Sequence, residues 1–150
     1  MGQTLTNVLV HVVFSTKNRD KLLAADVRPR LHAYIAAIVA GEGGRAFAVG
    51  GGLDHIHLLA RLPAKMAVSD LMRQVKANSS RWLRETFPAL RSFGWQSGYA
   101  AFSVSHSQLD AAFRYVETQE EHHRKHSFED EFVSLLKRNE LDYDERYLWT

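Results

Sequence analysis

RAFAVGGGLDHIHLLARL, residues 45–62, contains two strand-like runs that flank three consecutive glycines. The first run is RAFAVG (45–50) and the second is LDHIHLLARL (53–62), and apolar side chains dominate both. Glycine adopts the backbone angles of a tight hairpin turn without steric cost. We therefore predict an antiparallel β-hairpin that turns at Gly50-Gly51-Gly52.

The segments around this hairpin have strand-like or helical patterns. Strand-like runs lie at 6–16 and 93–105, and apolar residues at helical spacing lie at 27–39 and 69–87. Ser69 or Asp70 fits the start of the second helix, which ends before Pro88. The resulting order β-α-β-β-α-β predicts an α+β fold: a ferredoxin-like (split βαβ) antiparallel sheet with helices on its faces.

The rest of the chain predicts a C-terminal helical extension. A third helix, with Ser105 or Ser107 at its cap, precedes a fourth over residues 127–140. Their apolar stripes are Leu109, Ala112, Phe113 and Val116 in the third helix and Phe128, Phe132, Leu135 and Leu136 in the fourth. The aromatic residues of 141–150 are expected to dock on the protein. We predict a single domain over residues 1–150.

Composition narrows the class of protein. A chain of 150 residues with 45% apolar content can bury one ordinary core, and the lack of cysteine excludes disulfides and thiolate sites. Its apolar runs are shorter than the roughly 20 residues that span a bilayer, so we expect no membrane segment and a cytoplasmic location. The net charge is only +2, but the charges are unevenly distributed. Residues 64–91 contain six basic and two acidic residues, whereas residues 127–150 contain three basic and seven acidic residues. The basic part fits a polyanionic partner or a solvated helix face, and the acidic tail is expected to pack away from such a partner.

His55 and His57 are the first candidate site residues. Side chains two apart on a strand point to the same face, so the two imidazoles project together and Ile56 points into the core. Two histidines at this spacing bind one metal ion, or one satisfies a buried hydrogen bond while the other lies at an edge. Asp54 and the glycines place the pair near a strand end that a ligand can approach. Asp54 itself fits either a ligand or a turn residue.

Tyr115 and Gln119 are the second candidate pair. At i and i+4 of a helix they share a face, so Tyr115 is either a boundary residue with an available hydroxyl or an amphipathic core tyrosine. His122 and His123 follow in a basic run that fits surface residues better than ligands. A tyrosine can attack a phosphodiester, and a divalent ion on two histidines and an amide oxygen would polarise the phosphate. These ligands permit Mg²⁺ or Mn²⁺ and also, by ligand type, Zn²⁺.

The His55-Ile56-His57 strand and the Tyr115-x-x-x-Gln119 helix together resemble the single-tyrosine HUH transposases of the IS200-like group, including their REP-associated relatives. The resemblance extends over nearly the whole chain and includes HVVFSTKNR, GGLDHIHLLARLP, VSDLMRQVKANSSRW, WQSGYAAFSVS, YVETQEEHHRK and YDERYLW. One departure is Leu53, because many relatives have proline before the Asp-His pair.

The resemblance implies a bacterial enzyme that binds, nicks and rejoins single-stranded DNA at mobile-element or repeat ends, usually beside a hairpin. It implies that Tyr115 is the nucleophile of a covalent 5′-phosphotyrosine intermediate. It also implies that His55, His57 and Gln119 bind a divalent metal, Mg²⁺ or Mn²⁺. The family works as a homodimer, commonly with the tyrosine helix of one subunit at the histidines of the other. The alternatives are a catalytically inactive or recruited single-stranded or hairpin DNA-binding protein on the same fold, and a metallohydrolase of small phosphoesters.

Basic residues supply candidate DNA contacts in two places. Arg73, Lys76 and Arg84 share a polar face of the helix that begins near residue 69. Lys17 and Arg19 follow the first strand. Contacts from such residues to phosphates give salt-sensitive and largely sequence-independent affinity.

Overall fold

The computed structural model describes residues 2–119 and 127–150. Its centre is a four-stranded antiparallel sheet with the strand order β2-β3-β1-β4. The strands are β1 (Leu9–Ser15), β2 (Arg45–Gly51), β3 (His55–Arg61) and β4 (Ala100–Val104). This order, with a helix after β1 and another after β3, confirms the predicted α+β, ferredoxin-like arrangement.

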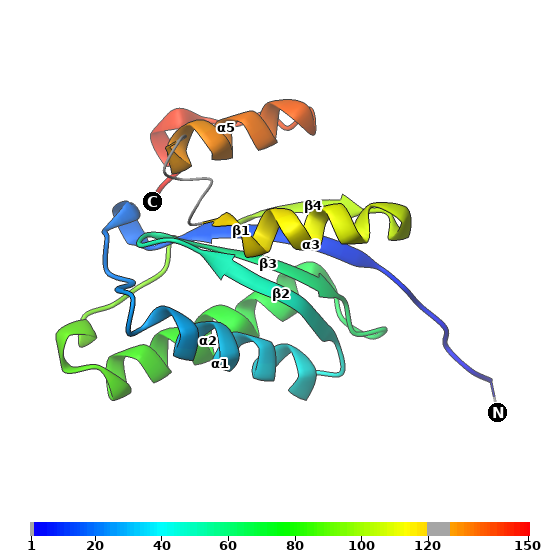
Figure 1. The fold of residues 1–150 in the computed structure, drawn as a ribbon, viewed down its shortest axis with the longest axis horizontal. Helices are drawn as coiled ribbons and strands as arrows, with labels where there is room; N and C mark the ends of the chain where they lie inside the picture. The colour runs from blue at the N-terminus through cyan, green and yellow to red at the C-terminus, as the bar shows by residue number, and fades with distance from the viewer. Residues whose placement is uncertain (1, 120–126) are drawn as a thin grey trace.

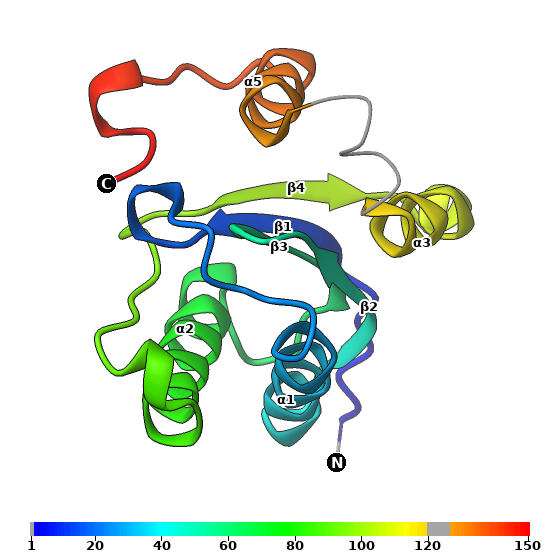
Figure 2. The ribbon, with the colours of Figure 1, turned by 60° about the vertical axis from the view of Figure 1, so that its left-hand side comes forward.

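Helices cover both faces of the sheet (Figure 1, Figure 2). On one face lie α1 (Arg28–Gly41) and α2 (Val68–Thr86). On the other lie α3 (Leu109–Glu117) and α5 (Phe128–Arg138), which belong to the predicted C-terminal extension. Of the two extension helices, α3 packs on the β2–β3 side of the sheet and α5 on the β1–β4 side.

Alternation along the central strands divides their side chains between two layers. The core under α1 and α2 takes one set of alternate residues: Val10, Val12, Phe14, Ile56, Leu58 and Ala60. Val13 and Leu59 point the other way and join smaller clusters under α5 and α3. Because the side-chain period of a strand is two, His11, His55 and His57 fall on the face covered by α3 and α5.

The predicted start of α2 was wrong. Neither Ser69 nor Asp70 is the N-cap, because the helix begins at Val68 after Ala67. Asp70 contributes in another way: its carboxylate accepts a hydrogen bond of 3.1 Å from the main-chain N–H of Ala67. An acid at this third helical position satisfies a main-chain donor and complements the helix dipole.

The predictions for α3 were also partly wrong. Neither Ser105 nor Ser107 caps it, because the 3-10 helix η3 (His106–Gln108) intervenes and Gln108 is the N-cap. Phe113 does not belong to the buried stripe, since its side chain is 41% exposed. Val116 is buried and packs on β2 and β3, so α3 docks on a narrower face than predicted.

The predictions for the fourth helix and the chain end are confirmed. Ser127 caps α5 by accepting a hydrogen bond of 3.2 Å from Asp130 N–H, and the four apolar side chains of its stripe are buried. The chain end docks as well, because Ser97 N–H donates to the carbonyl of Thr150 at 2.7 Å. Trp149 packs on the same cluster as α5. Among the described residues, no helix combines the length and apolar character needed to cross a membrane.

Candidate functional site

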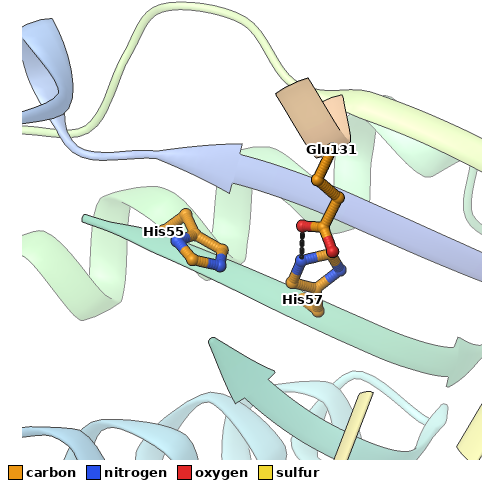
Figure 3. Close-up of side chains that lie close together, drawn as sticks. All are labelled: His55, His57 and Glu131. Carbon is orange, nitrogen blue, oxygen red and sulfur yellow. Dashed lines mark hydrogen bonds and ion pairs between the residues drawn. The ribbon is translucent and has the colours of Figure 1, made fainter. Parts of the chain in front are cut away.

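β3 and α5 bring together two histidines and a carboxylate on the face of the sheet under α5 (Figure 3). The Nε2 atom of His57 lies 3.0 Å from Oε1 of Glu131. Ligand atoms of His55, His57 and Glu131 all lie within 4.8 Å of one another, and all three side chains are buried. Two imidazoles and a carboxylate oxygen are a donor set that fits a divalent transition metal such as Mn²⁺.

Adjacent residues orient His55. Its Nδ1 lies 2.8 Å from the Asp54 carboxylate, and its ring stacks on Phe128 of α5 with centroids 3.9 Å apart. A carboxylate at one ring nitrogen fixes the tautomer and leaves the other nitrogen, Nε2, as the atom that could bind a metal. Gly52 leaves room for the ring, because a Cβ there would lie 3.0 Å from His55 Cε1. Asp54 therefore orients His55, a role that the sequence analysis had left open.

His11 contacts His57 from the neighbouring strand β1. The two rings stack with centroids 5.0 Å apart, and His11 Nε2 lies 2.7 Å from His57 Nδ1. Burial, followed by the neighbouring His57, lowers the pKa of His11 from 6.5 to about 3, although Glu131 opposes the shift. His11 was not among the site residues predicted from the sequence. The available signal was that His11 alternates with Val10 and Val12 along the strand, because this alternation places the His11 side chain on the face opposite the main core.

Tyr115 reaches this cluster from α3. Its hydroxyl donates a short hydrogen bond to Oε2 of Glu131, and its ring centroid lies 5.8 Å from that of His57. Burial raises the pKa of Tyr115 well above 10, and the hydrogen bond to Glu131 and the negative charge of that residue add to the rise. A hydrogen bond from Gln119 and the charge of Arg138 oppose it. The tyrosine is therefore held as a neutral hydrogen-bond donor.

Gln119 is buried one helical turn beyond Tyr115, and its Nε2 donates to the main-chain oxygen of Tyr115 at 3.1 Å. Of the four residues predicted to carry the chemistry, His57, Tyr115 and Gln119 lie in one cluster. The fourth, His55, adjoins this cluster beside His57. Glu131, which the sequence analysis missed, links the cluster. The available signal was its place beside the stripe of α5, three residues after Phe128 and four before Leu135. His122 and His123 lie outside the described residues.

The candidate DNA contacts on α2 are placed far from the histidines, because α2 covers the opposite face of the sheet (Figure 2). Lys76 is turned toward the chain itself and donates to the carbonyls of Gln96 and Gly98 at 2.7 and 2.5 Å. Burial lowers the pKa of Lys76 from 10.5 to about 8. Arg84 similarly donates to the carbonyl of Phe93 at 3.2 Å. Arg73 is largely exposed, with Asp70 as its ion-pair partner at 3.4 Å.

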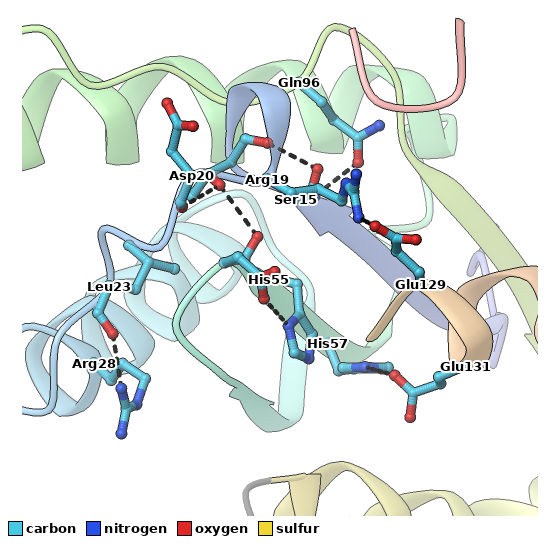
Figure 4. Close-up of polar contacts among 12 residues, drawn as sticks. Ser15, Arg19, Asp20, Leu23, Arg28, His55, His57, Gln96, Glu129 and Glu131 are labelled. Carbon is cyan, nitrogen blue, oxygen red and sulfur yellow. Dashed lines mark hydrogen bonds and ion pairs between the residues drawn. The ribbon is translucent and has the colours of Figure 1, made fainter. Parts of the chain in front are cut away.

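Lys17 and Arg19 lie nearer the site, on the 3-10 helix η1 (Lys17–Arg19). Lys17 is exposed, whereas Arg19 is half-buried, stacks over Trp149 and forms an ion pair with Glu129 of α5 (Figure 4). Arg19 also lines a cavity of about 490 Å³ that reaches His55. The cavity offers an approach to His55 beside a basic side chain.

The strand order and a helix-borne tyrosine beside a strand-borne histidine pair define an α+β, ferredoxin-like protein with a candidate metal site next to a tyrosine. The chain belongs to the IS200-like transposase family, because the family model described as "Transposase IS200 like" matches residues 4–119. Members of this family are DNA-cleaving and strand-transferring enzymes, and membership gives this chain a transposase role.

Individual relatives agree with this assignment. The chain is 30% identical over 110 residues to the transposase for insertion sequence element IS200 of Salmonella typhimurium, covering 69% of this chain and 72% of that protein. It is 25% identical over 114 residues to the ISDra2 transposase TnpA of Deinococcus radiodurans, covering 73% of this chain and 81% of the relative.

Two solved structures share the fold. One is a putative transposase from Deinococcus radiodurans R1, with a TM-score of 0.64, 23% identity and coverage of 79% of this chain and 96% of that one. The other is a REP-associated tyrosine transposase bound to a REP hairpin, with a TM-score of 0.60, 15% identity and coverage of 85% and 73%.

Proposed function

We propose that this transposase binds, nicks and rejoins single-stranded DNA at mobile-element or repeat ends through a covalent 5′-phosphotyrosine intermediate on Tyr115. The observation that carries the proposal is the position of the Tyr115 hydroxyl. It donates to Glu131, which also contacts His57, so the half-buried candidate nucleophile and His57 share one hydrogen-bonded cluster. In this cluster the tyrosine and the histidines belong to the same chain.

The proposed cofactor is Mg²⁺ or Mn²⁺. His55 and His57 supply two nitrogen ligands, and the third is an oxygen of Gln119, as the family resemblance implies, or of Glu131, which lies at the histidine pair. The ion would polarise the scissile phosphate and stabilise its charge. The chain's own part is to orient His55 through Asp54 and to hold the half-buried tyrosine beside Glu131 and His57.

The proposed DNA partner is single-stranded, with hairpin ends. One structural neighbour is bound to a REP hairpin, which supports a hairpin as a ligand of this fold. Lys17 and Arg19 are the proposed phosphate contacts nearest the site, because Arg19 lines the cavity that reaches His55. Arg73 of α2 is a more distant contact, and Lys76 and Arg84 are available only if they leave their present carbonyl partners.

We also propose a homodimer. The proximity of Tyr115 to His57 within one chain supports a dimer in which each subunit's tyrosine serves its own histidine pair, as against the exchanged arrangement that the resemblance implies. Light scattering across a range of protein concentrations tests the dimer, and a constant monomer mass would refute it.

The test of the function is incubation with single-stranded DNA that contains a hairpin and its flanking sequence, with Mn²⁺ or Mg²⁺. A denaturing gel should reveal a covalent protein–DNA species. Tyr115→Phe should abolish this species and leave hairpin binding intact, whereas the matched control Tyr147→Phe, at a residue that is 66% exposed, should not change it. An adduct that persists in Tyr115→Phe refutes the assignment of the nucleophile. Hairpin binding without an adduct in the unmodified protein supports the inactive or recruited DNA-binding alternative.

A further inference from the structure

We propose that a cavity between β4, α3 and α5 binds the DNA strand downstream of the cut, and that Arg138 contacts the first phosphate after the scissile one. This inference rests on the proposed function, because the cut defines which strand is downstream. It gives a DNA-binding role to α5, a helix that lies beyond residues 4–119, the part matched by the family model.

The cavity lies on the sheet face that α3 and α5 cover (Figure 2). We call it the tyrosine cavity, and its lining includes His11 of β1, Ser103 of β4, Gln108 of η3, Tyr115 of α3 and Arg138 of α5. Its volume is about 440 Å³. Sites for small ligands measure roughly 300–1,000 Å³, so this cavity is large enough for a nucleotide.

The Arg138 side chain is available to a ligand. Arg138 is the last residue of α5 and is exposed. No hydrogen bond or ion pair joins its guanidinium to another described residue. Arg19, by contrast, pairs with Glu129, and Arg84 donates to a main-chain carbonyl. Arg138 can therefore bind a phosphate without giving up an existing partner, and its planar guanidinium matches phosphate oxygens well.

The charge of the tyrosine cavity also suits a phosphate. None of the described residues that line it is acidic, whereas the cavity that reaches His55 has Asp54 and Glu129 in its walls. Ser103 and Gln108 are exposed, and their hydroxyl and amide groups can donate hydrogen bonds to phosphate oxygens. An anionic strand is therefore favoured in the tyrosine cavity over the other one.

Tyr115 determines which part of the DNA lies in the tyrosine cavity. The charge of Arg138 opposes the rise in the Tyr115 pKa, so the guanidinium lies close enough for its charge to act on the phenol. In the proposed reaction the phosphate that joins Tyr115 carries the downstream strand, whereas the upstream strand leaves with the 3′-OH. The first downstream nucleotide is therefore held covalently at the tyrosine cavity. The phosphate that follows it is the one that Arg138 contacts.

The first experiment measures hairpin binding in the Tyr115→Phe protein, in which no strand is cut. The matched variants are Arg138→Gln and Lys137→Gln, because Lys137 is exposed on the same helix but does not line the cavity. One contact to a single-strand phosphate contributes about 0.7 to the slope of log Kd against log salt. Arg138→Gln should lower that slope by about 0.7 and weaken binding about fivefold near 0.1 M salt. Lys137→Gln should stay within about twofold, and Arg138→Lys, which keeps the charge, should recover most of the lost slope.

A second experiment locates the contact on the DNA. Adduct formation by the unmodified protein first identifies the cut, and hairpin substrates then carry a neutral methylphosphonate at single phosphates downstream of it. At the first phosphate after the scissile one, this change should weaken binding to the Tyr115→Phe protein about fivefold. Once Arg138→Gln is added, the same change should weaken binding by less than about twofold, because the contact is already lost. With Lys137→Gln the loss should remain about fivefold.

Adduct formation by protein that retains Tyr115 separates binding from chemistry. Arg138→Gln should raise the DNA concentration at half-maximal rate about fivefold and leave the maximal single-turnover rate within about twofold. The reason is that a contact to a phosphate that does not react is equally strong before and during the reaction.

Three outcomes would overturn the inference: an unchanged affinity and salt slope in Arg138→Gln, an equal loss in Lys137→Gln, or a methylphosphonate effect that Arg138→Gln leaves intact. The two levels of proposal fail differently. If the unmodified protein forms no adduct but Arg138→Gln binds the hairpin more weakly than Lys137→Gln, the nicking function fails and the phosphate site stands. If the adduct forms and Arg138→Gln binds as tightly as the original protein, only the role of Arg138 is refuted.

Discussion

Replacing Gly50 with alanine tests how the sheet positions the tyrosine helix. Gly50 of β2 pairs with His57 of β3, and α3 crosses it so closely that a Cβ at residue 50 would overlap the main-chain oxygen of Val116. The same Cβ would lie 3.2 Å from the Val116 carbonyl carbon. A main-chain atom cannot relieve an overlap by changing a side-chain rotamer, so either α3 must move outward or β2 must bend.

The expected loss of stability follows from two opposing terms. Overpacking of this kind costs about 3 kcal/mol at the upper end of its usual range, and alanine recovers about 1 kcal/mol by restricting the unfolded chain. The free energy of unfolding should therefore fall by about 2 kcal/mol, which corresponds to a Tm lower by roughly 4–8 °C for a chain of this size. Urea unfolding at pH 7.5 measures the first quantity and thermal unfolding the second.

The same displacement should reduce activity, because Tyr115 directly precedes Val116 on α3. A shift of several tenths of an ångström weakens the alignment of the hydroxyl with Glu131, and we expect adduct formation to slow by about tenfold. Gly98→Ala is the matched control, because a Cβ there has no neighbour within 4 Å. If Gly50→Ala unfolds within about 0.5 kcal/mol of the original protein and forms the adduct at full rate, the close packing of α3 on β2 is refuted.

Three further predictions concern pH, helix capping and metal binding. The pKa of His11 is about 3 in the folded state against 6.5 in the unfolded chain, so the unfolded chain binds a proton first as pH falls below 6.5. Protonation of this residue should therefore lower the free energy of unfolding by about 2 kcal/mol at pH 5. Urea unfolding of His11→Gln should lack that part of the pH dependence. Ser127→Ala removes the acceptor for the Asp130 N–H and should lower the free energy of unfolding by about 1 kcal/mol; no change would mean that water replaces the cap. His55→Ala should weaken Mn²⁺ binding at least tenfold in calorimetry, and chelation should abolish adduct formation but not hairpin binding; equal Mn²⁺ affinity would remove His55 from the ligand set.

Much of the fold was predictable because its strands carry local signals. The run 53–62 alternates around Ile56 and follows three glycines, and these features indicate both the hairpin and the face of each side chain. Element boundaries were less accurate. β1 begins at Leu9 rather than at residue 6, because strand pairing with β3 and β4 starts there. The cap of α2 was wrong because a main-chain N–H at Ala67 finds its acceptor three residues later.

The site was predictable where its residues are close in sequence. His55 and His57 share a strand, so their spacing placed them on a common face, and the four-residue spacing of Tyr115 and Gln119 placed that pair together even though α3 ends at Glu117, before Gln119. Glu131 lies 74 residues from its partner His57, and no local pattern relates two such positions. Within the run EDE it also resembles the acids beside it, which face solvent. Only the docking of α5 distinguishes it from them.

The acidic tail was predicted to pack away from a DNA partner, and this stays a prediction because the surface that contacts DNA is itself a proposal. Residues 127–150 lie against the sheet face that carries the histidines, with Glu131 inside the cluster and Glu129 paired with Arg19 at the edge of the cavity. A phosphate that enters beside His55 therefore competes with the Glu129 carboxylate for Arg19. Ion pairs that are partly exposed contribute only about 0–1 kcal/mol, so this exchange is energetically small. The acids of α5 thus differ in effect according to burial: the exposed Glu129 is readily displaced by a phosphate, whereas the buried Glu131 keeps its contacts with Tyr115 and His57.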